Sequence, residues 1–312
     1  MKSIVKNLEN RISRQLRASG FRRLIVGVSG GADSIALLSL LHANKAGIIA
    51  AHCNFHLRGK ESDRDADFVS DFCSTRNIPL ERIDFDVPAY IERHSGISVE
   101  MACRDLRYEW FAQLTEKHSA DRTVTAHNAD DNIETLFLNL LRGSGTRGLR
   151  GMLPDNGRVW RPLLETSRRE IELYLKEKGI DFVTDSTNLE SDYRRNFLRN
   201  EVLPLLRSRW EGFDKAMGRS ISFLRDENSV VEESIRHLFP APGEPLHTET
   251  ILKFPAPELL IRRWIEPLSP FSTTAGEVMS AIKADKPDVK RWKLRHGTLE
   301  LRNRKLFLKK DV

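Results

Sequence analysis

The sequence has few cysteines and no long hydrophobic run. Its 312 residues include three cysteines, none in a Cys-x-x-Cys pair, which excludes a disulfide framework. No apolar stretch approaches the roughly 20 residues that span a bilayer, and the segment 1–10 lacks the apolar core of a secretory signal. We therefore expect a cytoplasmic protein without membrane contact and with reduced, buried cysteines.

Aromatic residues are also scarce, at 8% of the chain, but the remaining composition is that of a globular protein. Hydrophobic residues make up 40% and charged residues 30%, which excludes a disordered or collagen-like chain. The length suggests two domains, at about 150 residues for each. Basic residues exceed acidic ones by 50 to 44, and this net charge of +6 favours a polyanionic partner.

Four short apolar segments predict β-strands, at residues 24–28, 47–53, 82–87 and 122–126. Sequence of helical length follows each of them, and strands that alternate with helices form parallel β-α-β units. We therefore predict an α/β fold with an open, mostly parallel sheet and helices on both faces. We assign this domain to residues 1–210, and a linker helix with a smaller helical or α+β domain to residues 211–312.

The second domain is expected to begin with a long helix and to end in a basic hairpin. The helix is predicted over 213–238, two shorter helices near 258–265 and 274–283, and the hairpin over 289–309, turning at 296–297 or at 302–304. Within residues 290–310, nine Lys and Arg residues accompany a single acidic residue, Glu300. This excess suits binding to phosphates, and a solvated protein face is the alternative.

The most informative segment, Val-Ser-Gly-Gly-Ala-Asp-Ser, lies directly between a predicted strand and a predicted helix. Its glycines allow a tight turn that brings N–H groups against an anion, and the helix start adds its positive end. Its serine hydroxyls would donate to the same oxygens. Neither a Walker A sequence nor G-x-G-x-x-G is present. The residues that we assign to a phosphate-binding loop are Ser29, Gly30, Gly31, Ala32, Asp33 and Ser34.

Charged side chains gather in two further segments. Arg104 and Arg107 share one face of a predicted helix and suit a phosphate, although each could form a surface salt bridge. Asp131 and Glu134 share a face at a predicted helix start, where they would cap the helix or hold Mg²⁺ or an ammonium group. Asp33 beside a phosphate requires a cation, so we expect Mg²⁺ or a positively charged substrate there.

The Ser-Gly-Gly-x-Asp-Ser loop resembles the pyrophosphate loop of the N-type ATP pyrophosphatases, which have an adenine nucleotide α-hydrolase-like fold. The loop alone does not choose among the members of that superfamily. Seven further segments do, in an order and spacing that resemble the tRNA(Ile)-lysidine synthase family over residues 24–206. They are residues 52–59, 100–108, 126–135, 141–152, 161–164, 185–188 and 193–204.

The resemblance implies a ligase that forms a carbon–nitrogen bond on RNA. ATP would adenylate the C2 oxygen of cytidine 34 in the CAU anticodon of tRNA(Ile). The ε-amine of free L-lysine would then displace AMP, giving lysidine, so that the tRNA reads AUA instead of AUG. The implied cofactors are ATP and Mg²⁺, and the implied partners are this tRNA and lysine. The resemblance leaves the oligomeric state open, and a homodimer is possible.

The resemblance also assigns roles to the site residues. The loop would hold ATP, with Asp33 on Mg²⁺. Asp131 and Glu134 would bind the lysine ammonium groups or deprotonate the attacking amine, and Arg195 or Arg199 would face the lysine carboxylate. The helix arginines would contact ATP or the flipped cytidine. Candidate catalytic residues are therefore Asp33, Arg104, Asp131 and Glu134, with Arg107 as a substrate contact. The candidate tRNA contacts are Arg147, Arg150, Arg302, Arg304 and Lys305.

The chain also departs from the family pattern. Asn128 stands where the family commonly has His, and Asn132 where it has Gln, and both replacements keep hydrogen-bonding ability. Many members carry another C-terminal module, so the chain resembles a short form or is truncated.

Three alternatives give different functions. A tRNA thiolase would need a cluster-binding or persulfide-carrying cysteine set, which Cys53, Cys73 and Cys103 do not supply. A non-catalytic RNA-binding protein would leave the phosphate loop unexplained. An amide-forming ligase would not need the basic C-terminus.

Overall fold

The computed structural model describes residues 2–94, 96–184, 193–269, 273–286 and 288–311. It divides the chain into a first unit, Met1–Phe223, and a second unit, Leu224–Val312, each with its own sheet and core. The division falls inside helix α11 (Phe213–Arg236) and not at the expected residue 210. The reason is packing, because Phe213 and Ile221 are buried in the first unit, whereas Ile235 belongs to the core of the second.

The first unit is built on five parallel strands in the order β3-β2-β1-β4-β5, which confirms the predicted α/β fold. The strands are β1 Arg23–Gly27, β2 Gly47–Asn54, β3 Leu80–Asp84, β4 Arg122–Val124 and β5 Val159–Trp160. β3 ends earlier than the predicted 82–87 because Asp86 caps the next helix by accepting a hydrogen bond from the Ala89 N–H. The sequence analysis missed β5, which is too short to show an alternating pattern.

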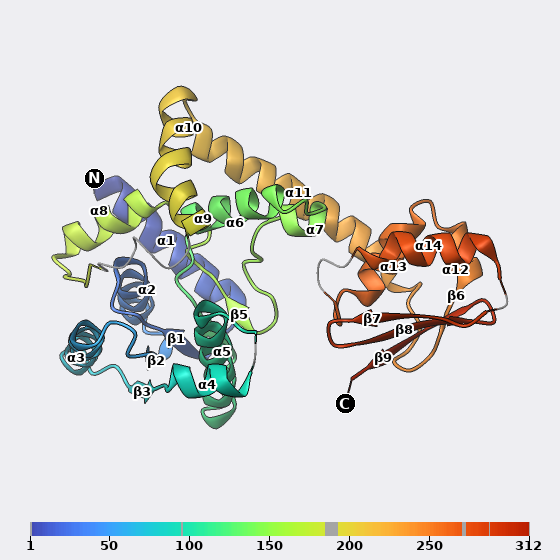
Figure 1. Cartoon of the computed structure of the whole chain (residues 1–312). Helices are drawn as coiled ribbons and strands as arrows, with labels where there is room; N and C mark the ends of the chain where they lie inside the picture. Colours follow the sequence, from blue (N-terminus) through green and yellow to red (C-terminus); the bar gives the residue numbers. More distant parts are fainter. Residues whose placement is uncertain (1, 95, 185–192, 270–272, 287, 312) are drawn as a thin grey trace. The chain divides into compact units, whose positions relative to one another are not determined.

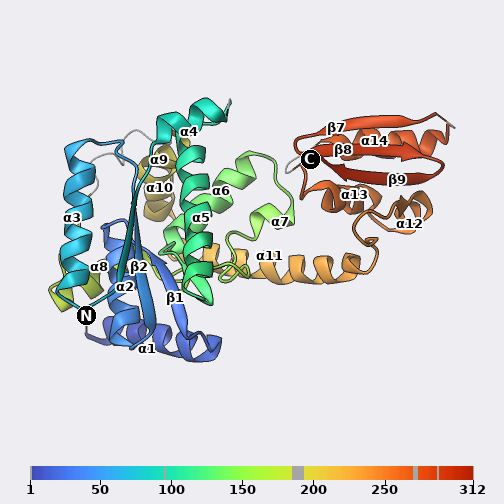
Figure 2. The ribbon, with the colours of Figure 1, turned by 90° about the horizontal axis from the view of Figure 1, so that it is seen from below.

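Helices cover both faces of this sheet (Figures 1 and 2). In chain order they are α1 Lys2–Ser19, α2 Ala32–Ala43, α3 Lys60–Ser74, α4 Val87–Arg93, α5 Val99–Lys117, α6 Ala129–Leu141, α7 Thr146–Leu149, α8 Arg168–Lys178, α9 Tyr193–Phe197, the π-helical turn Leu198–Val202 and α10 Leu203–Arg209. Leu24 and Val26 of β1 pack in one core with α1, α2 and α8, whereas Ile25 between them packs against α5. Alternate residues of the strand therefore anchor the two helical layers.

The order of the strands locates a crevice. β2 and β3 lie on one side of β1, and β4 and β5 lie on the other, so the direction of winding changes between β1 and β4. Ligands of open α/β sheets bind at such a switch point, outside the carboxyl ends of the strands. The segments 28–34 and 125–131, which follow β1 and β4, therefore meet at this crevice.

The second unit is an antiparallel sheet with helices on one side (Figure 1). The strands are β6 Leu246–His247, β7 Lys290–Leu294, β8 Gly297–Arg302 and β9 Lys305–Lys310, and the helices are α12 Thr248–Lys253, α13 Pro257–Ile265 and α14 Thr274–Ala284. The predicted hairpin turns at both proposed places and so has three strands. Among the residues described in either unit, no helix is long and apolar enough to cross a membrane.

Candidate active site

The phosphate loop joins β1 to α2, which begins at Ala32. Gly30 has φ +93°, a conformation that favours glycine, and Gly31 caps the helix without a side-chain hydrogen bond. The Ser34 hydroxyl donates to the Gly31 carbonyl at 2.9 Å and accepts from the Ser29 N–H at 3.2 Å. The loop thus presents a preorganised turn and the positive end of a 12-residue helix.

A cavity of about 270 Å³, here called the loop cavity, opens over this turn. Its lining includes Ser29 and Ser34 on one side and Phe55, Arg107 and Tyr108 on another. The Arg107 guanidinium lies 5.2 Å from the centroid of the Phe55 ring. The cavity therefore combines hydroxyl donors, a cation and aromatic rings, the groups that a nucleotide requires.

Asp33 lies in the first turn of α2 and lines the loop cavity. Its Oδ2 accepts a hydrogen bond from Arg168 Nη1 at 2.5 Å, and among the described residues only the Asn128 side chain lies near enough to its buried Oδ1 to lower the Asp33 pKa, without a hydrogen bond of full geometry. Burial raises the pKa of the Asp33 carboxyl above its ordinary value, against the opposing effect of Arg168. A buried carboxylate oxygen without a full hydrogen bond fits a cation ligand.

The residues present fit Mg²⁺ only together with a phosphate ligand. In the described ranges no three His, Cys, Asp or Glu side chains come together as a metal site. Mg²⁺ commonly binds through one or two carboxylates and the phosphates of a substrate. Asp33 would supply the carboxylate.

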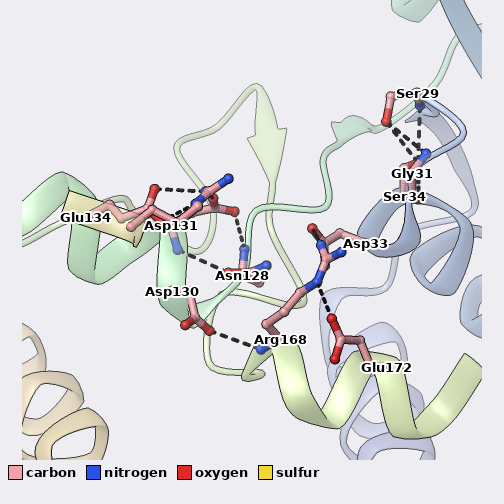
Figure 3. Close-up of polar contacts among 11 residues, drawn as sticks. Ser29, Gly31, Asp33, Ser34, Asn128, Asp130, Asp131, Glu134, Arg168 and Glu172 are labelled. Atoms are coloured by element: carbon pink, nitrogen blue, oxygen red, sulfur yellow. Dashed lines mark hydrogen bonds and ion pairs between the residues drawn. The ribbon is translucent and has the colours of Figure 1, made fainter. Parts of the chain in front are cut away.

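A second cavity of about 350 Å³ shares Asp33 and Asp131 with the first. We call it the arginine–carboxylate cavity, because four carboxylates and three guanidinium groups line it. Figure 3 shows its four acids together with Asn128 and Arg168. Its lining is Asp33, Asn128, Asp130, Asp131, Glu134, Arg168, Arg199, Leu203 and Arg207.

Glu134 is the most deeply buried of these carboxylates, with 1% of the residue exposed. Arg199 holds it through two hydrogen bonds, from Nε at 2.6 Å and from Nη2 at 2.9 Å, and Arg195 Nε lies 3.4 Å from the same group. Burial raises the Glu134 pKa, although Arg199 opposes this. Arg199 Nη2 also donates to Asp131 at 2.9 Å. The two arginines predicted for the site, Arg195 and Arg199, thus lie next to the predicted acidic side chains of Asp131 and Glu134.

Asp131 combines a capping role with a place in both cavities. Its Oδ2 accepts from the Asn128 N–H at 3.0 Å, and the Asn128 side chain accepts from the Asp131 N–H at 3.0 Å, so the two form a capping box. The other departure, Asn132, accepts a hydrogen bond from the Met152 N–H at 2.8 Å and ties α6 to the following loop.

Sequence reasoning did not single out Asp130, Arg168 and Arg207. Asp130 accepts hydrogen bonds from Arg207 Nη2 at 2.5 Å and from the Arg168 N–H at 3.0 Å, which joins α6 to α10 and α8. Arg168 and Arg207 lie just outside the segments that carry the resemblance, so the sequence provides no sign of their position.

The remaining predicted residues lie around or away from this site. The Arg104 guanidinium stacks 4.9 Å from the Tyr108 ring centroid. Half-buried Arg147 and Arg150 lie at α7, inside the segment 141–152 that carries part of the resemblance. The segment 185–188 lies outside the described residues. Arg302, Arg304 and Lys305 form the β8–β9 turn of the second unit, where Asn303 and Arg304 have positive φ values.

Known proteins resemble this chain in sequence and fold. A tRNA(Ile)-lysidine synthase of Parabacteroides distasonis is 40% identical over 265 residues, which are 84% of this chain and 60% of that protein. One of Porphyromonas gingivalis is 46% identical over 220 residues, 69% of this chain and 48% of that protein. The chain therefore spans about half to three fifths of the length of these curated relatives.

A solved structure and a family match complete the comparison. The U34-tRNA thiolase of Methanococcus maripaludis has a TM-score of 0.58 at 18% identity, over 71% of this chain and 78% of the thiolase, which shows a shared fold alone. The PP-loop domain family matches residues 4–206. That match covers the five-stranded sheet, the phosphate loop and the lining of both cavities except Arg207, and the chain belongs to the PP-loop domain family.

Proposed function

We propose that this protein is a tRNA(Ile)-lysidine synthase. It adenylates the C2 oxygen of cytidine 34 in tRNA(Ile) with ATP and then attaches free L-lysine to C2, in the cytoplasm. The observation that carries the proposal is that the loop cavity adjoins a cavity of mixed charge through Asp33 and Asp131. A nucleotide and an amino acid would then lie side by side. The likeness to relatives of this name supports the same reaction.

The loop cavity would hold ATP. The Ser29 and Ser34 hydroxyls and the first N–H groups of α2 would bind its phosphates, and Arg107 would add positive charge. Mg²⁺, when bound to Asp33 and the phosphates, would neutralise charge on the leaving pyrophosphate. Tyr108, with Arg104 stacked on it, offers an aromatic surface to ATP or to the flipped cytidine.

The arginine–carboxylate cavity would hold lysine, whose two ammonium groups and one carboxylate need partners of both signs. Asp131 lies on the wall between the two cavities and would receive an ammonium group. The three hydrogen bonds of Arg199 to Asp131 and Glu134 use only Nε and Nη2, which leaves Nη1 to face the lysine carboxylate. Glu134, being buried, acts as a positioning residue for Arg199.

Lysine transfer requires an unprotonated amine. As the ε-nitrogen bonds to C2, the bond from C2 to the adenylated oxygen breaks, and its electron pair leaves with AMP. The nitrogen loses a proton, which Asp131 would accept. Positioning and charge neutralisation supply most of the catalysis in this scheme.

The tRNA would extend over basic surfaces of both units. Arg147 and Arg150 belong to the first unit, and Arg302, Arg304 and Lys305 form an exposed turn in the second. Contacts of this kind bind the phosphate backbone without reading sequence. A homodimer is a separate prediction, which light scattering of the purified protein tests.

The experiment combines the protein with ATP, Mg²⁺, isotopically labelled lysine and an unmodified tRNA(Ile) transcript with a CAU anticodon. The expected result is lysidine at position 34, identified by the mass of the nucleoside, and none in a tRNA(Met) transcript. AMP release without lysine incorporation would contradict the choice of nucleophile. Sulfur incorporation from an added donor would indicate a thiolase instead. Folded protein that releases no pyrophosphate would overturn the whole proposal.

A further inference from the structure

Arg168 occupies the border between the phosphate loop and the arginine–carboxylate cavity. Its Nη1 donates to Asp33 Oδ2 at 2.5 Å, and its Nε donates to Glu172 at 3.0 Å (Figure 3). Asp33 in turn lies in the helix turn that follows the loop. Arg168 is therefore the guanidinium group that is bonded directly to a residue of the predicted phosphate site.

The backbone of Arg168 is fixed, whereas its side chain can exchange partners. Its N–H donates to Asp130 at 3.0 Å, at the start of α8, where Ser167 and Glu170 form a capping box. The side chain is 42% exposed, and its second partner, Glu172, is 55% exposed. The pair with Glu172 is exposed and therefore weak, whereas the Asp33 side chain is only 24% exposed, so a new anion for the guanidinium and a cation for Asp33 must replace that pair together.

The phosphate loop itself supplies no cation. Its donors are hydroxyl and N–H groups, and it lacks a lysine in the place that a Walker A loop provides one. Adenylation joins a nucleophilic oxygen to the α-phosphorus and breaks the bond to the bridging oxygen, whose electron pair leaves with pyrophosphate. That oxygen gains negative charge, which a nearby cation stabilises.

We propose that Arg168 binds the β- and γ-phosphates of ATP and then the departing pyrophosphate, exchanging its ion pair with Asp33 for one with the polyphosphate. Asp33 holds the guanidinium beside the loop until the ligand arrives. The exchange then frees Asp33 Oδ2, next to Oδ1, which lacks a full hydrogen bond, for the cation that accompanies the phosphates. This inference rests on the proposed use of ATP and adds a residue to it.

The test measures the affinity of the full chain for inorganic pyrophosphate and for AMP by titration calorimetry, with and without Mg²⁺. R168Q is compared with R169Q, which neutralises the exposed neighbouring arginine. Loss of a charged hydrogen bond is expected to weaken pyrophosphate binding by about 10-fold to 100-fold in R168Q. AMP, which lacks the β- and γ-phosphates, should bind R168Q with an affinity within about 2-fold of the wild type. Pyrophosphate and AMP should both bind the control variant R169Q within about 2-fold of the wild type.

Two results would overturn the proposal. Unchanged pyrophosphate affinity in R168Q would exclude a contact, and an equal loss of AMP affinity would indicate only a distorted loop. Circular dichroism checks that R168Q folds. If it does not, R168M keeps the test open, because methionine keeps an unbranched apolar side chain and removes the charge, and pyrophosphate binding equal to the wild type would reject the assignment.

These outcomes are independent of the lysidine assay. If lysidine is absent but pyrophosphate binding depends on Arg168, the proposed function fails and this inference stands. If lysidine forms and R168Q binds pyrophosphate with wild-type affinity, the proposed function stands and the role of Arg168 is rejected.

Discussion

Two ion pairs near the candidate binding residues, one in each unit, differ in their exposure. In the first unit, Arg199 pairs with Glu134, which is buried, and the pair joins helices that are 65 residues apart in sequence. In the second unit, Arg304 pairs with Asp285 while 74% and 52% of the two side chains stay exposed. Exposed pairs are weak and screened by salt, whereas breaking a buried pair leaves an uncompensated charge. Charges of the first unit should therefore determine catalysis, and those of the second unit tRNA affinity.

The largest effect is expected where the two cavities meet. D33N removes a carboxylate that lines both, so adenylation should fall by more than about 100-fold, measured as pyrophosphate release with tRNA present. D71N, at an exposed acid on α3, is the control and should keep its rate. If D33N releases pyrophosphate at the wild-type rate, Asp33 has no part in the ATP site.

A smaller and more selective loss is expected at Glu134. In E134Q the Arg199 guanidinium loses a charged partner, so lysine transfer should fall by about 10-fold to 100-fold while adenylation changes by about 3-fold or less. Single-turnover assays separate the two steps, as pyrophosphate release without lysine and lysidine formation with it. E201Q, an exposed acid on the π-helical turn, serves as the control. Equal loss in both steps would contradict the division of roles.

The positions of the phosphate loop between β1 and α2 and of Asp131 at the start of α6 agree with the sequence prediction, because both depend on local rules. Each segment follows a strand, and the neighbouring positions of β1 and β4 bring their carboxyl ends together. Asp131 lies at a helix start that a capping box specifies. Such features need only nearby residues and a parallel sheet, so a single sequence suffices to predict them.

The burial of Glu134 could not be predicted in the same way. Apolar residues recur along α6 at helical spacing, but Leu140 and Leu141 are 54% and 74% exposed, whereas Glu134 is covered. Its burial depends on Arg199, whose position depends on a π-helical turn. A carboxylate is buried at tolerable cost only when such a partner arrives from elsewhere in the chain.

In the second unit, the comparison predicts a loss of binding that salt suppresses. Replacing Arg302, Arg304 and Lys305 by Gln should weaken tRNA binding by about 10-fold at low salt. It should also make the negative slope of log affinity against log salt shallower by about 2, because fewer phosphate contacts are made. The matched control neutralises three exposed basic residues of α1, namely Lys6, Arg14 and Arg17. Filter binding over a salt series measures both. An unchanged slope in the turn variant would reject it as a tRNA contact.

The smallest expected effect concerns the stability of the first unit and a half-buried histidine. Burial lowers the pKa of His127 to about 4, from an ordinary value of 6.5, against the opposing effect of Asp131. The unfolded chain therefore takes up a proton below pH 6.5 that the folded chain resists, so stability is lost as the pH falls toward 4. The free energy of unfolding of the first unit should fall by about 1 kcal/mol between pH 6 and pH 5.

Hydrogen exchange of β4 and α6 amides, corrected for intrinsic rates, measures this loss, with β8 amides of the second unit as the reference. H127N should reduce the pH dependence of stability in the first unit only. An unchanged pH dependence in H127N would show that another titratable group causes it.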